Sequence, residues 1–96
     1  LSKVYRYVLK SHEQELVPLA DELDFIRAYL FLLDKRFGAG LSVSMQVSPL
    51  ATRRYVVPVA LQMLVENAVK HNVVRPERPL TVRIYDENGQ TLVVQN

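Results

Sequence analysis

The residues between Pro18 and Gly38 carry the sequence feature that most constrains the fold. Apolar side chains recur there in alternating steps of four and three residues, at Leu19, Leu23, Ile26, Leu30, Leu33 and Phe37. This spacing places them on one side of an α-helix and is typical of a helix packed lengthwise against others. Asp21 and Glu22 lie near the positive end of its dipole, and Gly38 can take the left-handed conformation that closes a helix. We therefore predict a bundle-type helix from about residue 18 to 37.

A second apolar stripe, formed by Phe25, Tyr29 and Leu32, lies beside the first. It widens the apolar face beyond what a single partner helix would cover. Two interpretations remain open: a helix in the core of a monomer, or a helix shared with a second copy of the chain. Residues 2–11 also place apolar side chains at helical spacing, which predicts a short amphipathic helix before it. His12 then falls in a polar linker, where its simplest interpretation is an exposed residue without a catalytic role.

The C-terminal half of the chain has the patterns of strands. Residues 41–47 alternate apolar and polar side chains, which predicts a strand with one buried face. Residues 80–85 and 91–94 flank the turn signal Asn88-Gly89 and predict a β-hairpin. With a helix between the first strand and the hairpin, the order favours an α/β sandwich, in which one layer of helix packs against a sheet.

The helix predicted between Pro58 and Asn72 combines a buried face with a chemical face. The apolar arc of the helix consists of Leu61, Leu64, Val65, Ala68 and Val69. The arc beside it consists of Met63, Asn67, Lys70 and His71. Asn67 offers a neutral side-chain oxygen, which suits Mg²⁺ because this ion keeps several waters and takes few protein ligands. Lys70 can reach phosphate oxygens, and His71 can donate a ring N–H to phosphate or sugar. The pattern indicates a site for ATP with Mg²⁺.

Glu66 is a further candidate on this helix. It precedes Lys70 by four residues, in the order that favours an ion pair on a helix surface. Such a pair stabilises a helix by only about 0.3–0.5 kcal/mol, and the spacing by itself favours that structural role. We nevertheless count Glu66 with Asn67 and Lys70 as the candidate catalytic residues. Asn67, Lys70 and His71 are the candidate nucleotide ligands, with Asn67 as the metal ligand.

Composition excludes several functional classes. The chain has 96 residues with 12 Lys or Arg and 10 Asp or Glu, so its net charge of +2 is far from the clustered basic excess of nucleic-acid-binding proteins. It contains no cysteine, which excludes disulfides and thiolate metal sites. Its longest apolar run, residues 55–65, is interrupted by Pro58 and Gln62 and is too short to span a membrane. Because it starts at Leu1 and stops inside an apolar run, we expect a fragment of a longer chain.

Residues 61–72 resemble a known motif. Their sequence pattern, Leu-Gln-x-Leu-Val-Glu-Asn-Ala-x-Lys-His, is similar to the N box of the GHKL ATPase superfamily and most like that of the LytS-type sensor histidine kinases. Upstream segments also resemble that family: Val17-Pro18-Leu19, Glu22-Leu23, Tyr29-Leu30, Arg36-Phe37 and Val57-Pro58. The resemblance covers nearly all of residues 4 to 96.

The resemblance implies a fold class and a division of the chain. Residues 1–38 would form the end of a dimerisation helical bundle, and residues 39–96 the N-terminal part of a histidine-kinase-like ATP-binding domain. The fold class would be α+β, a helical-bundle segment followed by a truncated GHKL, or Bergerat-type, α/β sandwich. The glycine-rich boxes that hold adenine and form a lid in this family would follow Asn96, so the chain alone would bind ATP weakly or not at all.

The resemblance also implies a function for the intact protein. A two-component sensor histidine kinase transfers the γ-phosphoryl group of ATP to a histidine and then to an aspartate of a response regulator. In this interpretation Asn67 binds Mg²⁺, while Lys70 and His71 neutralise charge on the γ-phosphoryl group. The accepting histidine of the family lies in a Pro-His-Phe-like motif, which this sequence does not contain, so the acceptor would precede Leu1.

The same resemblance implies partners and a location. The partners would be a second copy of the chain, bound through the helical bundle, and the response regulator. The intact protein would be anchored in the inner membrane outside this segment, with the kinase part in the cytoplasm.

Met63 departs from the pattern of hydrolytic relatives, which place a water-activating acid one turn before the N-box Asn. A methionine side chain cannot accept a proton, and a kinase needs no activated water, so Met63 favours a kinase over a hydrolase. Two alternatives stay open: a non-catalytic dimerisation or scaffold module with a degenerate sandwich, and another GHKL ATPase or kinase.

Overall fold

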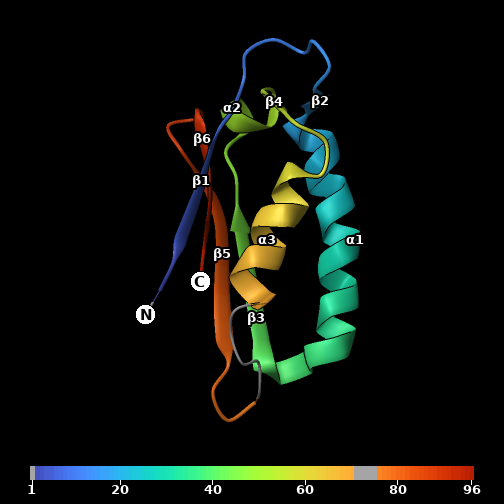
Figure 1. Ribbon diagram of the computed structural model, residues 1–96, viewed down its shortest axis with the longest axis vertical. Coiled ribbons are helices and arrows are strands. Elements are labelled where there is room, and N and C mark those ends of the chain that lie inside the picture. Colours follow the sequence, from blue (N-terminus) through green and yellow to red (C-terminus); the bar gives the residue numbers. More distant parts are fainter. Residues whose placement is uncertain (1, 71–75) are drawn as a thin grey trace.

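Two main helices and a four-stranded sheet make up most of the structure, a computed structural model in which residues 2–70 and 76–96 are described (Figure 1). Its elements follow in the order β1 (Val4–Val8), β2 (Val17–Pro18), α1 (Leu19–Phe37), the 3₁₀ turn η1 (Gly38–Gly40), β3 (Leu41–Gln46), α2 (Pro49–Thr52), β4 (Tyr55–Val56), α3 (Ala60–Lys70), β5 (Leu80–Glu87) and β6 (Thr91–Gln95). Within the described ranges, no helix has both the length and the apolar composition needed to cross a membrane.

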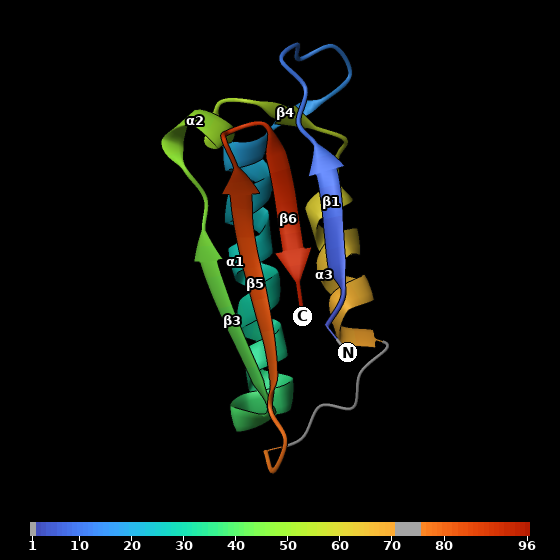
Figure 2. The same cartoon turned by 90° about the vertical axis from the view of Figure 1, so that its left-hand side faces the viewer.

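The main sheet has the strand order β1-β6-β5-β3. β3 and β5 run parallel, whereas β6 is antiparallel to both of its neighbours. A parallel pair needs a crossover connection, and α3 lies in the connection between β3 and β5. Both α1 and α3 lie on one face of the sheet (Figure 1 and Figure 2), and β2 pairs with β4 in a second, two-stranded sheet. The predicted α+β class, a helical layer on a sheet, is confirmed.

The core lies between this sheet and the two helices. α1 contributes Leu19, Leu23 and Ile26, each at most 3% exposed, and α3 contributes Leu61 and Val65 at 0%. Side chains from β5 and β6 complete the cluster, namely Val82, Ile84, Leu92 and Val94. The apolar spacing in steps of four and three therefore identifies the inner face of α1. Full burial of one such Leu or Ile side chain stabilises the fold by about 1.5–3 kcal/mol.

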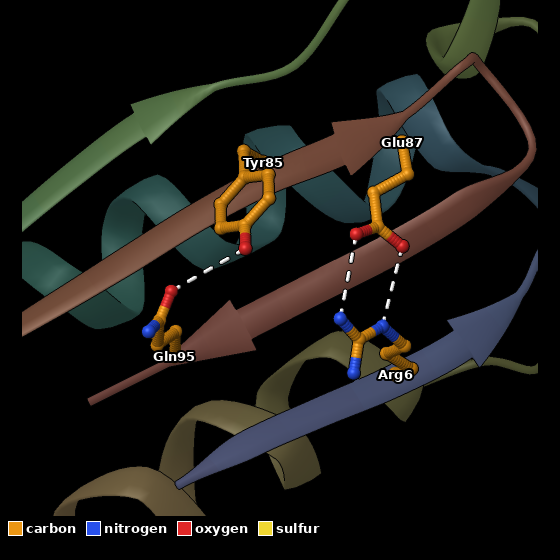
Figure 3. A network of polar contacts seen from close by, with 4 residues as sticks. All are labelled: Arg6, Tyr85, Glu87 and Gln95. Atoms are coloured by element: carbon orange, nitrogen blue, oxygen red, sulfur yellow. Dashed lines mark hydrogen bonds and ion pairs between the residues drawn. The ribbon is translucent and has the colours of Figure 1, made fainter. Parts of the chain in front are cut away.

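The opposite face of the sheet is covered by polar side chains. Arg6 of β1 donates to Glu87 of β5 at 3.2 and 3.4 Å, and the Tyr85 hydroxyl donates to Gln95 at 3.3 Å; these contacts are drawn in Figure 3. Val93 pairs with both Arg6 and Tyr85 across the sheet, so these three side chains share this face. Val93 is fully buried, which shows that the long polar side chains cover it.

β1 corrects the helix predicted for residues 2–11. Residues Val4–Val8 instead form a strand that pairs with β6. Tyr5 and Tyr7 are half-buried and pack against the core, while the residues between and beside them are exposed. Over so short a stretch, periods of 2 and 3.6 residues fit the apolar positions almost equally well, and β-branched and aromatic side chains favour the strand. The assignment of residues 1–38 to a dimerisation bundle stays a prediction.

α1, β3 and the hairpin lie where the sequence predicts them. α1 ends at Phe37, and the N–H of Gly38, at a φ of +52°, donates to the carbonyl of Asp34. In the hairpin, Asn88 and Gly89 have φ angles of +56° and +69°. Two successive positive φ angles are typical of the type I′ turn that Asn-Gly favours.

Asp86 ties this hairpin to the segment that follows β3. Its carboxylate accepts hydrogen bonds from the Ser48 backbone N–H at 2.7 Å, the Ser48 hydroxyl at 2.8 Å and the Gly89 N–H at 2.8 Å. Burial by itself would raise the pKa of Asp86, but these hydrogen bonds stabilise the charged form, and the pKa is lowered overall. The ionised carboxylate therefore stabilises the folded chain.

Asp86→Asn should destabilise the chain at neutral pH by about 1–2 kcal/mol, because an amide cannot accept all three hydrogen bonds. The folded pKa lies below the ordinary value of 3.8, so the stabilisation is complete above that value and is lost as the pH falls through the folded pKa. Urea unfolding of the wild type and of Asp86→Asn, measured from about pH 7 to about pH 2, should give free energies of unfolding that become equal at the acid end of this range.

The matched control is Asp24→Asn, which removes an exposed carboxylate paired with Arg27 on α1. An exposed pair contributes little, so this variant should follow the wild type at every pH. A gap between Asp86→Asn and the wild type that stays constant with pH would contradict the role assigned to the Asp86 charge.

Candidate functional site

α3 carries the predicted site residues, and its buried side decides where they point. Four of the five predicted apolar positions are buried, and the fifth is half-buried: Leu61, Val65, Ala68, Val69 and then Leu64. The neighbouring arc therefore faces outward, with Met63 60% exposed, Asn67 half-buried and Lys70 exposed. α3 is described as far as Lys70, so the predicted ligand His71 and the predicted helix end at Asn72 lie outside the described residues.

A groove between α1 and α3 brings two of the candidate residues together with side chains of α1. The cavity has a volume of about 370 Å³ and is lined by Tyr29, Leu33, Arg36, Phe37, Glu66, Val69 and Lys70. We call it the α1–α3 groove. Arg36 and Lys70 bring two positive charges to it, against one negative charge from Glu66. The groove thus combines apolar walls with a net positive charge, which suits an anionic group.

The Tyr29 phenol lies among the charges of the α1–α3 groove. Burial raises the pKa of Tyr29, the negative charge of Glu66 raises it further, and the positive charge of Arg36 acts in the opposite direction. The guanidinium carbon of Arg36 lies 4.9 Å from the centre of the Phe37 ring, an attractive cation–π arrangement. Side chains from two different helices therefore interact electrostatically across the groove.

Glu66 does not form the ion pair with Lys70 that the sequence spacing allows. It accepts a hydrogen bond of 2.9 Å from the side-chain amide of Gln62, one turn earlier on α3. The two ion pairs among the described residues lie elsewhere, between β1 and β5 and along α1. The interpretation of Glu66 and Lys70 as a surface ion pair is therefore wrong for this structure.

Asn67 adjoins the α1–α3 groove without lining it. Its backbone carbonyl accepts a hydrogen bond of 3.5 Å from the Tyr5 hydroxyl of β1. Successive residues of a helix are separated by about 100°, so Asn67 and Glu66 face different directions. The structure thus brings Glu66 and Lys70 together in the groove and places Asn67 on the neighbouring side of α3.

The start of α3 is held by side chains that the sequence does not single out for this role. The Glu22 carboxylate accepts hydrogen bonds from the Val59 N–H at 3.2 Å and the Leu61 N–H at 3.1 Å. The Tyr7 hydroxyl accepts one from the Val57 N–H at 2.9 Å. From its sequence position, Glu22 is expected only to oppose the dipole of its own helix, but its carboxylate turns to α3. These contacts join distant segments, and no local pattern signals them.

Comparison with known proteins gives a family and several curated relatives. The sequence model of the family described as histidine kinase matches residues 1–41. The chain is 36% identical over 103 residues to the sensor protein LytS of Enterococcus faecalis, a match that covers 94% of this chain and 17% of that protein. It is 35% identical over 71 residues to the sensor protein LytS of Bacillus subtilis, and 37% identical over 71 residues to the sensor histidine kinase BtsS of Escherichia coli. Each of these two matches covers 74% of this chain and 12% of the relative.

The matches differ in what they cover. The chain spans 17% or less of the length of these three relatives. The histidine kinase family model ends at Leu41, before α3 begins. The match to the Enterococcus protein covers 94% of the chain, so it includes α3 and Asn67. No solved structure matches the chain.

Two substitutions should move the pKa of Tyr29 in opposite directions. Glu66→Gln should lower it, because the variant removes a negative charge, and Arg36→Gln should raise it, because the variant removes a positive charge. Tyrosine labelled with carbon-13 beside the hydroxyl lets NMR follow each phenol through an alkaline titration. The other four tyrosines serve as internal controls. A shift of the Tyr29 pKa in the same direction in both variants would contradict the proposed arrangement of charges.

Proposed function

This chain belongs to the LytS-type sensor histidine kinases, and we propose that it contributes the N-box part of the site at which such a kinase binds ATP. The intact kinase would pass the γ-phosphoryl group to a histidine upstream of this segment, and then to an aspartate of a response regulator. The observation that carries the proposal is the outward arc of α3, where Asn67 and Lys70 lie one turn apart above a buried apolar face. The relatives are named as sensor proteins and sensor histidine kinases, which supports this role.

Asn67 suits a magnesium ion that is shared with phosphate groups. Its side chain is half-buried on a helix and offers one neutral oxygen, and Mg²⁺ takes few protein ligands while it keeps waters and phosphate oxygens. The described residues contain no group of three or more His, Cys, Asp or Glu side chains that could hold a metal ion. Because of its neutral side-chain oxygen, we propose that Asn67 is the ligand that this segment contributes to the metal. When bound, Mg²⁺ neutralises charge on the phosphate groups.

Lys70 suits the phosphate groups themselves. It is exposed at the end of α3 and lines the positive α1–α3 groove. We propose that it neutralises charge on the γ-phosphoryl group during transfer, with His71 as a further donor. Glu66 stays a candidate catalytic residue, although it lines the groove with Tyr29 and faces away from Asn67.

Met63 supports a kinase rather than a hydrolase. It lies one turn before Asn67, is 60% exposed and carries a thioether in place of a proton acceptor. Water near Asn67 would therefore not be activated from this position, and ATP would be kept for transfer to histidine. The alternative of a non-catalytic dimerisation or scaffold module predicts no Mg²⁺-dependent nucleotide binding.

The partners and the location of the intact kinase are also proposals. Phe25 and Leu32 are 53% and 65% exposed on α1, and such apolar side chains suit contact with a second copy of the chain. A response regulator would receive the phosphoryl group. A membrane anchor would lie outside this segment, and the kinase part would lie in the cytoplasm at the inner membrane.

Asn67→Ala in the intact kinase should lower histidine phosphorylation by at least about tenfold, because it removes the metal ligand while the buried face of α3 stays intact. The kinase is incubated with Mg²⁺ and ATP labelled at the γ-phosphate, and the label on the protein is tested for acid lability. Circular dichroism checks that the variant is folded.

Met63→Ala is the matched control, since it shortens a more exposed side chain on the same arc. It should leave phosphorylation within about twofold of the wild type. Normal labelling of Asn67→Ala would contradict the metal-ligand assignment. A wild type that neither takes acid-labile label nor binds nucleotide would instead support the scaffold alternative.

A further inference from the structure

Glu22 is the buried charged side chain of this structure. It lies in the first turn of α1, is 6% exposed, and is the sole buried polar or charged residue in the described part of the chain. Its two carboxylate oxygens accept separate hydrogen bonds, one from the Val59 N–H at 3.2 Å and one from the Leu61 N–H at 3.1 Å. A negative charge at this end of α3 also interacts favourably with the positive end of the helix dipole. A buried charge is costly unless paired, so this arrangement calls for an explanation.

The residue that Glu22 holds has an unfavourable backbone conformation. Val59 has a φ of +72°, and a β-branched residue rarely adopts this left-handed region. Such conformations persist where surrounding contacts enforce them, and they gather at functional sites. The Val59 N–H is bound by Glu22, and its carbonyl accepts from the Met63 N–H at 3.0 Å. The strained residue thus connects the carboxylate directly to the first turn of α3.

We propose that Glu22 is a positioning residue for phosphotransfer, fixing the register and rotation at which α3 begins and so the direction in which Asn67 and Lys70 face. This inference rests on the proposed function. If the sequence of α3 slips by one residue along the helix, each side chain moves by about 1.5 Å along the axis and turns by about 100°. Such a turn would bring Asn67 to the place that Glu66 occupies beside the α1–α3 groove. Displacements of about 1 Å at a reaction site are enough to slow catalysis greatly.

The carboxylate has a property that an apolar contact lacks. Each of its oxygens accepts from one N–H, and because hydrogen bonds are directional, the pair holds the Val59 and Leu61 N–H groups in a fixed position relative to α1. Apolar packing of Leu61 and Val65 restrains the same helix with less directional selectivity. We therefore expect loss of Glu22 to affect the alignment of α3 more than the overall stability of the fold.

Glu22→Gln in the intact kinase tests the inference, because the amide keeps the shape of the side chain and one acceptor oxygen. Affinity for ATP with Mg²⁺ and the rate of histidine phosphorylation should each fall by about tenfold. Hydrogen exchange followed by mass spectrometry should show faster exchange in peptides that span residues 57–63. Peptides from β5 and β6 should keep the protection of the wild type.

Two further variants separate positioning from a general effect of charge or stability. Asp21→Asn removes the same charge from an exposed neighbour in the same turn of α1, and it should behave as the wild type. Val59→Gly removes the strain, since glycine adopts a positive φ freely, and its side chain is 45% exposed, so little packing is lost. Added to Glu22→Gln, it should restore nucleotide affinity by at least about threefold.

The outcomes distinguish this inference from the function on which it rests. If Glu22→Gln matches Asp21→Asn in affinity, rate and exchange, the positioning role is wrong while the proposed function stands. If β5 and β6 lose protection together with residues 57–63, Glu22 acts on global stability and the positioning role is again wrong. If the wild type binds no nucleotide and takes no label, the proposed function fails, and the role of Glu22 in phosphotransfer fails with it.

Discussion

The structure depends on a single apolar layer between two helices and one face of a sheet. Leu19 and Ile26 of α1 and Leu61 of α3 are fully buried in that layer, so each helix has one rotation about its axis that keeps its apolar arc covered. The rotation of α3 then directs Asn67 and Lys70 outward and turns Glu66 toward α1. The apolar groups of this helix therefore set which side of it faces outward, and the hydrogen bonds to Glu22 hold the residues at which it begins.

Features that are local or periodic in this chain could be predicted from its sequence. α1 is long and strongly patterned, and Gly38 ends it. The Asn88-Gly89 pair specifies a turn by its own backbone preferences. β1 could not be predicted in this way, because its alternating pattern becomes decisive only when β6 is present as a partner. The short pairs between β2 and β4 have too few residues to carry any pattern.

The residues of the candidate site also fall into two groups, those that a periodic pattern predicts and those that only tertiary packing brings together. The outward arc with Asn67 and Lys70 follows from the period of the helix. The groove does not, because Tyr29 and Arg36 come from α1 and meet Glu66 only when the two helices pack together. The buried carboxylate of Glu22 is the clearest case, since a Glu in the first turn of a helix is usually an exposed group that opposes the dipole. Only the tertiary structure shows that it serves a different helix.

The pairing of β1 with β6 has a consequence for how the chain is made. In Figure 2, β6 lies between β5 and β1, so it pairs with one strand on each side and connects β1 to the rest of the sheet. Synthesis proceeds from the N-terminus, and β1 therefore leaves the ribosome long before its partner exists. Closing so long a loop costs entropy before the pairing stabilises anything. Tyr5 and Tyr7 thus stay without a sheet until β6 is translated, and this edge of the sheet forms only after α1, α3 and β5 have been synthesised.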